Sequence, residues 1–347
     1  MTDTPSRTWR FARSMNCRIP LAIGLTAAAL CGAALTGITA EEPQAAVSIA
    51  ELTPRAEEAI EKGLEYIART QQPDGSWGKH KIATTALSLM AFMVKGHFPD
   101  QPPYGAQMSK GIDFLLGESK KGNGYMGLSM YEHGLATLVL SEAWGMTDRD
   151  NLRDALKNAV GVILRSQNSL GGWRYQPAPT DADISATVMQ VVALASAKEA
   201  GIMVPDAVIQ KAIAYVKSCE EKGTGGFCYQ PAGTAGVART AAGVMSLMMC
   251  GQREDAVTLR GLNWLKKMDQ NQFESADGFF FYAHYYAVQA MFQGGDEWYQ
   301  KWYPRIRESV LAKQAADGSW PDGNEVGTQF AILILGVPYR YLPIYQR

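Results

Sequence analysis

Apolar and polar positions follow a pattern that repeats about every 50 residues between residues 55 and 340. In the first repeat, apolar positions recur at three- and four-residue spacing at Ala59, Ile60, Gly63, Leu64 and Ile67. This spacing predicts an amphipathic helix. A second helix is expected over 83–94, where nearly every position is apolar, and a helix that is apolar on all sides is buried. Each repeat therefore predicts a helical hairpin with one exposed and one buried helix.

Five further pairs of helices are expected downstream. The more polar helices are predicted at 106–117, 152–166, 206–219, 256–268 and 303–314. The apolar helices are predicted at 131–144, 183–200, 237–250, 283–293 and 326–335, each followed by a glycine that suits a helix C-terminus. Two concentric rings follow from this order: an all-α, α/α toroid of six helical-hairpin repeats over residues 55–347. The last apolar helix has no polar face to end an open array, so we expect it to close against the first unit.

A short motif of glycine and an aromatic residue occurs in each repeat. The copies are Gly75-Ser76-Trp77, Gly124-Tyr125, Gly172-Trp173, Gly226-Phe227, Gly278-Phe279 and Gly318-Ser319-Trp320. The segment Lys62-Gly63-x-x-Tyr66-Ile67-x-x-x-Gln71-x-x-x-Gly75-x-Trp77 resembles the QW repeat of squalene–hopene cyclases and related terpene cyclases. Gln167-x-x-x-Gly171-x-Trp173 and Gln314-x-x-x-Gly318-x-Trp320 repeat its core. The resemblance implies the toroid shared by class II terpene cyclases and the β subunits of protein prenyltransferases. In each repeat, we expect the Gln side chain to hydrogen-bond to the next unit and the Trp side chain to pack over the loop between the two helices.

The first 40 residues differ in composition from the rest. Arg7, Arg10, Arg13 and Arg18 precede an uncharged stretch over 21–40 that ends at Ala40. This order predicts either a cleaved signal peptide or an uncleaved membrane anchor, because 20 apolar residues can just span a bilayer. We therefore expect an exported, periplasmic or extracytoplasmic protein, with residues 41–54 as a linker to the toroid.

Composition and motifs exclude several classes of function. The chain is 47% hydrophobic and 19% charged, which fits a large globular core, and its net charge of −1 leaves no basic surface for nucleic acid. It has no Walker or dinucleotide motif, so no cofactor is expected. Prenyltransferase β subunits bind zinc through Asp, Cys and His, but no D-x-C motif accompanies Cys228 and His284, so no metal is expected. Cys219 and Cys228 flank a Gly-rich loop and either pair or remain buried thiols.

Polar residues cluster just before the predicted inner helices. Six such loops gather at one end of a ring, where the helix N-termini add positive dipole ends. The segment Asp181-Ala182-Asp183-Ile184-Ser185 resembles the D-x-D-D-T motif of squalene–hopene cyclases. This implies Asp183 as the acid that protonates an alkene and Asp181 as its partner, although Ile184 replaces the third acid. Arg174 is expected to pair with Asp181, and Glu132 and His133 are the other candidate catalytic residues.

Aromatic residues near the same loops suit a carbocation, which they would stabilise by cation–π contact. The expected substrate-contacting residues are Trp173, Tyr175, Phe280, Tyr282, Tyr285 and Tyr286, together with His80, Arg239 and His284. Packing is the alternative interpretation of such aromatic runs.

Three functions fit this pattern. The first is a terpene-cyclase-like enzyme that cyclises an isoprenoid, a hydrophobic small molecule, in the barrel cavity. One barrel supplies only half of the two-barrel cavity of squalene–hopene cyclases, so a small substrate or a homodimer would be needed, and the aromatic last third of the chain allows membrane association. The second is a non-catalytic toroid that binds a lipid or a protein partner. The third is a carbohydrate-active toroid with a carboxylate pair drawn from Glu132, Asp181, Asp183 and Glu325.

Overall fold

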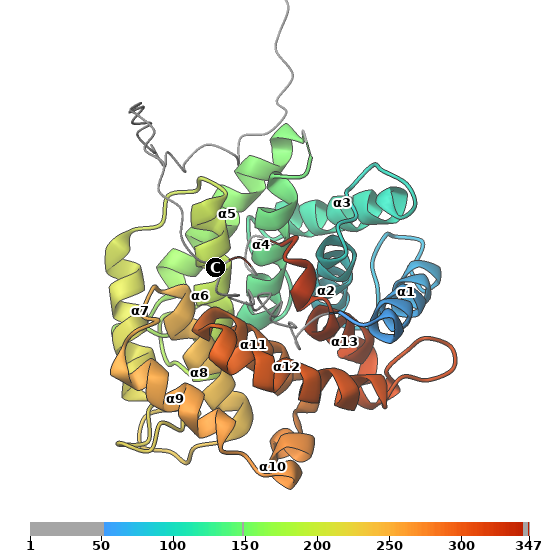
Figure 1. Ribbon diagram of the computed structural model, residues 1–347. Helices are drawn as coiled ribbons and strands as arrows, with labels where there is room; N and C mark the ends of the chain where they lie inside the picture. Colours follow the sequence, from blue (N-terminus) through green and yellow to red (C-terminus); the bar gives the residue numbers. More distant parts are fainter. Residues whose placement is uncertain (1–51, 148, 343–345, 347) are drawn as a thin grey trace, which may run out of the picture. The chain divides into compact units, whose positions relative to one another are not determined.

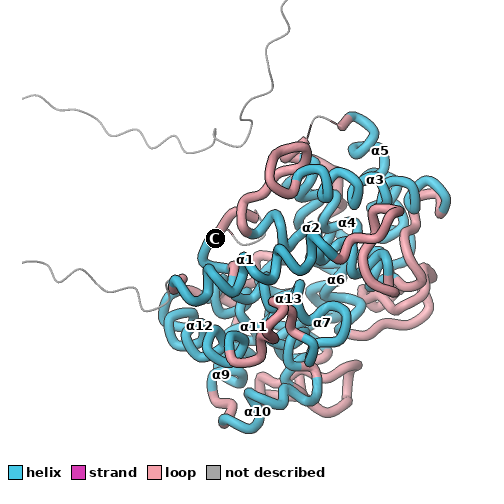
Figure 2. Tube along the Cα trace, turned by 90° about the vertical axis from the view of Figure 1, so that its right-hand side faces the viewer, coloured by secondary structure: helices cyan, strands magenta, loops and turns pink. Residues whose placement is uncertain are grey.

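The computed structural model describes residues 52–147, 149–342 and 346, and its regular elements there are helices joined by loops (Figures 1 and 2). The predicted signal peptide or anchor, and nearly all of the predicted linker, lie outside the described residues. Among the helices that are described, none combines the length and apolar character needed to cross a bilayer.

The helices form two concentric layers. The inner layer comprises α2 (Lys81–Val94), α4 (Met130–Trp144), α6 (Ile184–Glu199), α8 (Val237–Met249), α11 (Phe280–Gly294) and α13 (Gly327–Leu335). The outer layer comprises α1 (Pro54–Arg69), α3 (Gly105–Lys121), α5 (Asp150–Ser166), α7 (Asp206–Ser218), α9 (Ala256–Lys266) and α12 (Asp296–Leu311). Each inner helix packs on the next, and α13 packs on α2, so the ring is closed as expected (Figure 1). The all-α, α/α toroid is confirmed.

Two helices differ from the predicted pattern. The last outer helix begins at Asp296 rather than at 303, and it continues through Pro304 to Leu311. Asp296 and Glu297 lie in its first turn, where acidic side chains favour a helix start. A short helix, α10 (Gln270–Ser275), was not expected; Asp269 and Gln272 form a capping box that stabilises its N-terminus.

The repeated Gln and Trp tie neighbouring hairpins together. Gln71 Nε2 donates to the Gln107 carbonyl of the next outer helix at 2.9 Å, and Gln167 and Gln314 donate in the same way to Val208 and Ala59, each at 2.9 Å. The Gln314 bond joins the sixth unit to the first. Trp77, Trp173 and Trp320 are buried, and each indole Nε1 donates to a carbonyl of its own outer helix at 2.7, 2.8 and 2.7 Å. The structural role expected for both residue types is confirmed.

A small residue allows the ring to close tightly. A Cβ added at Gly63 of α1 would lie 2.9 Å from Ile332 Cδ1 and 3.0 Å from Trp320 Cζ3. Helix α1 can therefore pack directly on α13 because Gly63 has no side chain. This contact buries the last inner helix, which has no polar face of its own.

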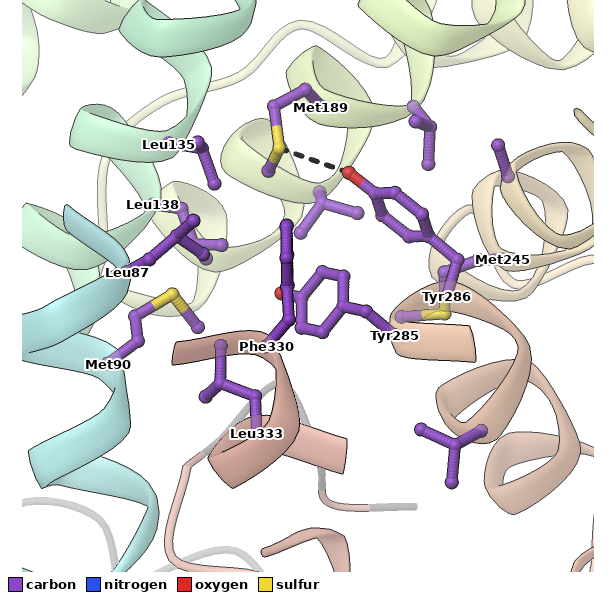
Figure 3. Close-up of a cluster of buried hydrophobic side chains, with 14 of the residues drawn as sticks. Leu87, Met90, Leu135, Leu138, Met189, Met245, Tyr285, Tyr286, Phe330 and Leu333 are labelled. Carbon is purple, nitrogen blue, oxygen red and sulfur yellow. Dashed lines mark hydrogen bonds between the residues drawn. The ribbon is translucent and has the colours of Figure 1, made fainter. Parts of the chain in front are cut away.

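The middle of the inner ring is filled with side chains. Leucine, methionine, tyrosine and phenylalanine residues from all six inner helices meet there (Figure 3). The labelled residues are Leu87, Met90, Leu135, Leu138, Met189, Met245, Tyr285, Tyr286, Phe330 and Leu333, all at most 4% exposed. The Tyr286 hydroxyl donates to Met189 Sδ at 3.2 Å across this cluster. The centre of the toroid is thus a packed core, in which Tyr285 and Tyr286, expected to contact substrate, are buried.

Candidate functional site

Hydrogen bonds join several of the loops that precede the inner helices, and we call these loops together the rim. The first N–H of α4, at Met130, donates to the Tyr175 carbonyl of the following unit at 2.8 Å. Ile184 N–H of α6 donates to the Tyr229 carbonyl at 3.0 Å, and Val237 N–H of α8 donates to Asp277 Oδ2 at 2.7 Å. Each of these helix starts is therefore held by the next loop. The predicted site residues divide into three groups on and beneath this rim.

The first group surrounds Asp183, which is fully buried. Its Oδ1 accepts the Ala186 N–H at 2.8 Å and so caps α6, while its Oδ2 lies 3.5 Å from Arg174 Nε. Burial raises the pKa of the Asp183 carboxyl, and the Ala186 N–H and the Arg174 charge offset part of that rise. A helix cap and a proton donor are both compatible with this environment.

Asp181 does not share that buried environment. Its side chain is 59% exposed and pairs with Arg174 Nη1 at 2.9 Å, so the predicted Arg174–Asp181 ion pair is present. Gln230 Nε2 also donates to this carboxylate. Arg174 thus lies between an exposed acid and a buried one, because Asp181 and Asp183 differ sharply in solvent exposure.

Tyrosine side chains lie beside Asp183. The Tyr229 hydroxyl donates to the Tyr175 hydroxyl at 3.1 Å, and the Arg174 guanidinium lies 5.5 Å from the Tyr229 ring centre. The Tyr282 ring packs edge-on against Tyr286, with ring centres 5.0 Å apart. Tyr175, Tyr229 and Tyr282 thus link the exposed rim to the packed core.

The second group belongs to the packing between layers. Both ring nitrogens of His133 are occupied: Nδ1 accepts the Met126 N–H at 3.2 Å and Nε2 lies 3.0 Å from the Ala159 carbonyl. His284 Nε2 lies 2.9 Å from the Phe273 carbonyl, and its ring also contacts Phe280. Burial lowers the pKa of each imidazole to about 4, so both are neutral at pH 7.

Two further candidates have structural partners. Trp173 is fully buried beneath its loop, with its backbone N–H donating to Thr187 Oγ1 at 3.1 Å. Arg239 lies on α8, and its Nη2 is 3.8 Å from Asp277 Oδ2, the oxygen that accepts the first N–H of the same helix. Neither these two residues nor the two histidines line the hollow described next.

The third group lies in a hollow of about 820 Å³ on the rim, between α3 and residues 73–82. Its lining is Pro73, Asp74, Gly75, Lys79, His80, Lys81, Ile82, Lys110, Asp113, Phe114, Gly117, Glu118, Lys121, Gly127, Leu128 and Glu132, a set that we call the α3 groove. His80 Nδ1 lies 3.9 Å from Glu132 Oε1 and His80 Nε2 lies 3.6 Å from Glu325 Oε1. Two predicted site residues, His80 and Glu132, therefore meet here.

A second hollow has a volume of about 470 Å³. It lies between α9 and the loop at Gly223 and Thr224, the corresponding place in another repeat. Gly75 approaches the Lys110 carbonyl as Gly225 approaches the Arg260 carbonyl, so these positions are equivalent. Seven residues after Lys110, the α3 groove is lined by Gly117. Seven residues after Arg260, the smaller hollow is lined by Lys267, which follows the last residue of α9.

Sequence reasoning missed the α3 side of this groove. The sequence predicted an ordinary outer helix here, with one face formed by Lys110, Asp113, Phe114 and Gly117. The predicted helix ended at Gly117, a residue type common at helix C-termini, whereas α3 continues to Lys121 and so has this glycine in its interior. A Cβ at Gly117 would meet nothing within 4 Å.

Cys219 and Cys228 are free thiols, both buried. Their backbones are paired, with Cys228 N–H donating to the Cys219 carbonyl at 2.8 Å. Burial raises the pKa of the Cys219 thiol to about 12, which keeps it protonated at neutral pH.

Comparisons with known proteins support the fold. The sequence profile of the prenyltransferase α–α toroid domain matches residues 199–296. A search of curated proteins finds no match.

Solved structures with several different activities resemble the chain. The α-1,6-mannanase GH76A of Salegentibacter sp. HEL1_6 is 9% identical, with a TM-score of 0.62 over 81% of this chain and 98% of that chain. A D-mannose isomerase is 14% identical, with a TM-score of 0.61 over 84% and 98%. The type II terpene cyclase MstE from Scytonema is 12% identical, with a TM-score of 0.55 over 84% and 98%. At these identities the likeness shows the fold alone, and together the comparisons support the α/α toroid superfamily rather than squalene–hopene cyclases in particular.

Proposed function

We propose that this protein is a ligand-binding α/α toroid that holds a polar, carbohydrate-like chain in the α3 groove. The observation that carries the proposal is the position of the open space. The centre of the inner ring is packed, whereas the α3 groove is open and lined by charged and polar groups. An isoprenoid needs an enclosed apolar cavity, while a hydroxylated chain needs hydrogen-bonding groups beside apolar faces.

The groove supplies both kinds of contact. Phe114 and Leu128 offer apolar surface, and Leu128 is 84% exposed. Lys79, Lys110 and Glu132 offer donors and acceptors within the same hollow. A mannanase and a mannose isomerase are among the proteins with this fold, so the fold is compatible with a carbohydrate ligand. The predicted export of the chain would place the groove outside the cytoplasm.

Glu132 gives the groove a candidate catalytic carboxylate. It accepts the Leu128 N–H and faces His80, whose other nitrogen faces Glu325. Acid–base cleavage of a glycosidic bond uses two carboxyl groups about 5–9 Å apart. The binding experiments would also detect cleavage products if Glu132 acts in such a pair. The proposal of binding does not require cleavage.

Filling the groove tests the proposal. Gly117→Trp adds a large side chain to a helix position where a Cβ meets nothing, so we expect ligand binding to fall at least about ten-fold. Stability should rise by up to about half a kcal/mol, because glycine is a poor helix former. Isothermal titration of the full-length protein with α-1,6-mannotetraose and with a panel of other oligosaccharides measures the first effect, and urea unfolding measures the second.

Gly161→Trp is the matched control. Gly161 lies within α5, in another outer helix, and does not line the groove. The proposal is wrong if Gly117→Trp binds oligosaccharides as tightly as the unsubstituted protein, or if no oligosaccharide binds at all.

A second candidate function rests on Asp183. Its buried carboxyl lies beside Arg174 and Tyr229, and burial raises its pKa, which favours the protonated form that any proton donor must start from. The aromatic residues above the core would then stabilise the cation. Substrate could reach them only if side chains such as Tyr286 and Met189 moved apart, since both are fully buried.

Asp183→Asn separates the two functions. The amide cannot donate the proton, so under the second candidate cyclic products from squalene or a prenyl diphosphate should disappear, as mass spectrometry would show. Oligosaccharide binding should stay unchanged, because Asp183 does not line the α3 groove. A cyclic product made by the unsubstituted protein and not by the variant would establish the second candidate, and unaltered recovery of isoprenoid by both would remove it.

A further inference from the structure

The acidic side chains of the α3 groove are largely neutralised by neighbouring cations. Lys81 Nζ lies 2.5 Å from Asp74, and Lys121 Nζ lies 2.6 Å from Glu118. Arg149, which lies outside the groove, pairs with Asp113. These three acids therefore contribute little net negative charge to a ligand in the hollow.

Two lysines of the same groove have no such partner. Within residues 52–147 and 149–342, neither Lys79 Nζ nor Lys110 Nζ has a carboxylate oxygen within 4.0 Å. The remaining acid of the lining, Glu132, accepts the Leu128 N–H and lies beside His80. The groove thus holds two ammonium groups that have no carboxylate partner among the described residues.

These lysines come from the two elements that form opposite sides of the hollow. Lys79 lies on the loop, and its backbone N–H donates to Glu325 Oε2 at 2.6 Å, which fixes the loop at that point. Lys110 lies on α3, and its carbonyl oxygen is 2.5 Å from the place a Cβ would take at Gly75. The loop and the helix are therefore in direct contact, and packed backbone anchors both elements that carry the two lysines.

We infer that the α3 groove recognises an anionic chain, a carboxylated or sulfated oligosaccharide, whose acidic group is held by Lys79 and Lys110. The inference rests on the proposed carbohydrate function and adds the charge of the ligand. Unpaired cations in a concave site concentrate positive potential there, and hydrogen bonds from ammonium to carboxylate or sulfate are stronger than neutral ones.

A charge-matched titration tests this inference. We would titrate the full-length protein with tetragalacturonate, with a sulfated tetrasaccharide and with neutral α-1,6-mannotetraose, and with inorganic sulfate alone. At least one anionic chain should bind about ten-fold more tightly than the neutral one, and its affinity should fall as salt is raised from 50 to about 300 mM. Sulfate alone should bind weakly, because it lacks the chain that occupies the rest of the groove.

Removing the two lysine charges from the protein is the second test of this inference. The double variant Lys79→Gln with Lys110→Gln should lose about ten-fold more affinity for the anionic chain than for the neutral one, because glutamine keeps a hydrogen-bond donor but removes the charge. Lys120→Gln is the matched control, since Lys120 is an exposed lysine of α3 outside the groove.

The outcomes separate the two proposals. Equal binding of neutral and anionic chains, still blocked by Gly117→Trp, would overturn the anionic inference and leave the proposed function standing. Binding of inorganic sulfate as tight as that of the anionic chain would also overturn it. Absence of binding by every oligosaccharide would overturn both.

Discussion

Replacing Trp173 with alanine is expected to lower the free energy of unfolding by about 3–5 kcal/mol, the usual range for deleting a buried tryptophan. Trp173 is fully buried, and its Nε1 donates to the Ile163 carbonyl at 2.8 Å. Alanine would leave a cavity between α5 and α6 and an unpaired carbonyl. Urea unfolding followed by circular dichroism measures the change.

A smaller replacement distinguishes packing from ligand contact. Trp173→Phe keeps most of the buried surface and loses the indole hydrogen bond, so a loss of about 1–2 kcal/mol is expected with unaltered ligand affinity. If Trp173→Phe stayed as stable as the unsubstituted protein but lost ligand binding, the residue would belong to a binding surface, and its structural assignment would be wrong.

Glu142 is expected to make stability fall as the pH rises. It is buried on α4, where its Oε1 accepts the Ser196 hydroxyl and its Oε2 has no hydrogen-bond partner among the described residues. Burial raises its pKa from 4.5 to about 7, and the Ser196 hydrogen bond offsets part of that rise. The folded state therefore holds the proton more tightly than the unfolded state. The cost of ionising the buried group is absent below pH 4.5 and complete above about pH 7.

The expected size follows from the two pKa values. One unit corresponds to about 1.4 kcal/mol, so the change from 4.5 to about 7 is worth about 3 kcal/mol. Glu142→Gln should therefore stabilise the protein at pH 8 by up to that amount and should flatten the pH dependence between pH 4.5 and 7. Glu199→Gln, at an exposed position of α6, serves as the control. Identical pH profiles for Glu142→Gln and the unsubstituted protein would contradict this account.

The fold could be predicted from the sequence because its determinants are local and repeated. The apolar run of 83–94 is sufficient to predict a buried helix, and Gln71 and Trp77 recur at fixed spacing with the partners expected of them. The start of α12 was missed, since the predicted helix began at 303. In the structure, Asp296 and Glu297 start the helix a full two turns earlier.

The site was less predictable, because it depends on contacts between distant segments. Spacing alone places Asp181 and Asp183 together, yet the structure exposes one carboxylate and buries the other as a helix cap. His133 and His284 looked like mouth residues because they lie near inner-helix starts. The direction of a side chain near a helix start depends on the helix packed behind it. Here the Ala159 carbonyl of α5 holds His133, and the Phe273 carbonyl of α10 holds His284.

The α3 groove could not be predicted for a related reason. It forms where α3 lies against a loop of the preceding unit, and its lining includes Gly117, where an added Cβ would meet nothing within 4 Å. A repeat pattern shows which positions are equivalent, such as Gly117 and Lys267, but the hollow appears only when both neighbours are in place.

The most direct test is a crystal structure of the full-length protein soaked with the tightest-binding oligosaccharide. The central claim is that the functional site is the α3 groove and not the packed centre of the inner ring. We expect electron density for the chain between α3 and residues 73–82, within hydrogen-bonding distance of Lys79, Lys110 or Glu132. Density beside Asp183 and Tyr286, with the core side chains displaced, would contradict the account and place the site on the axis of the toroid.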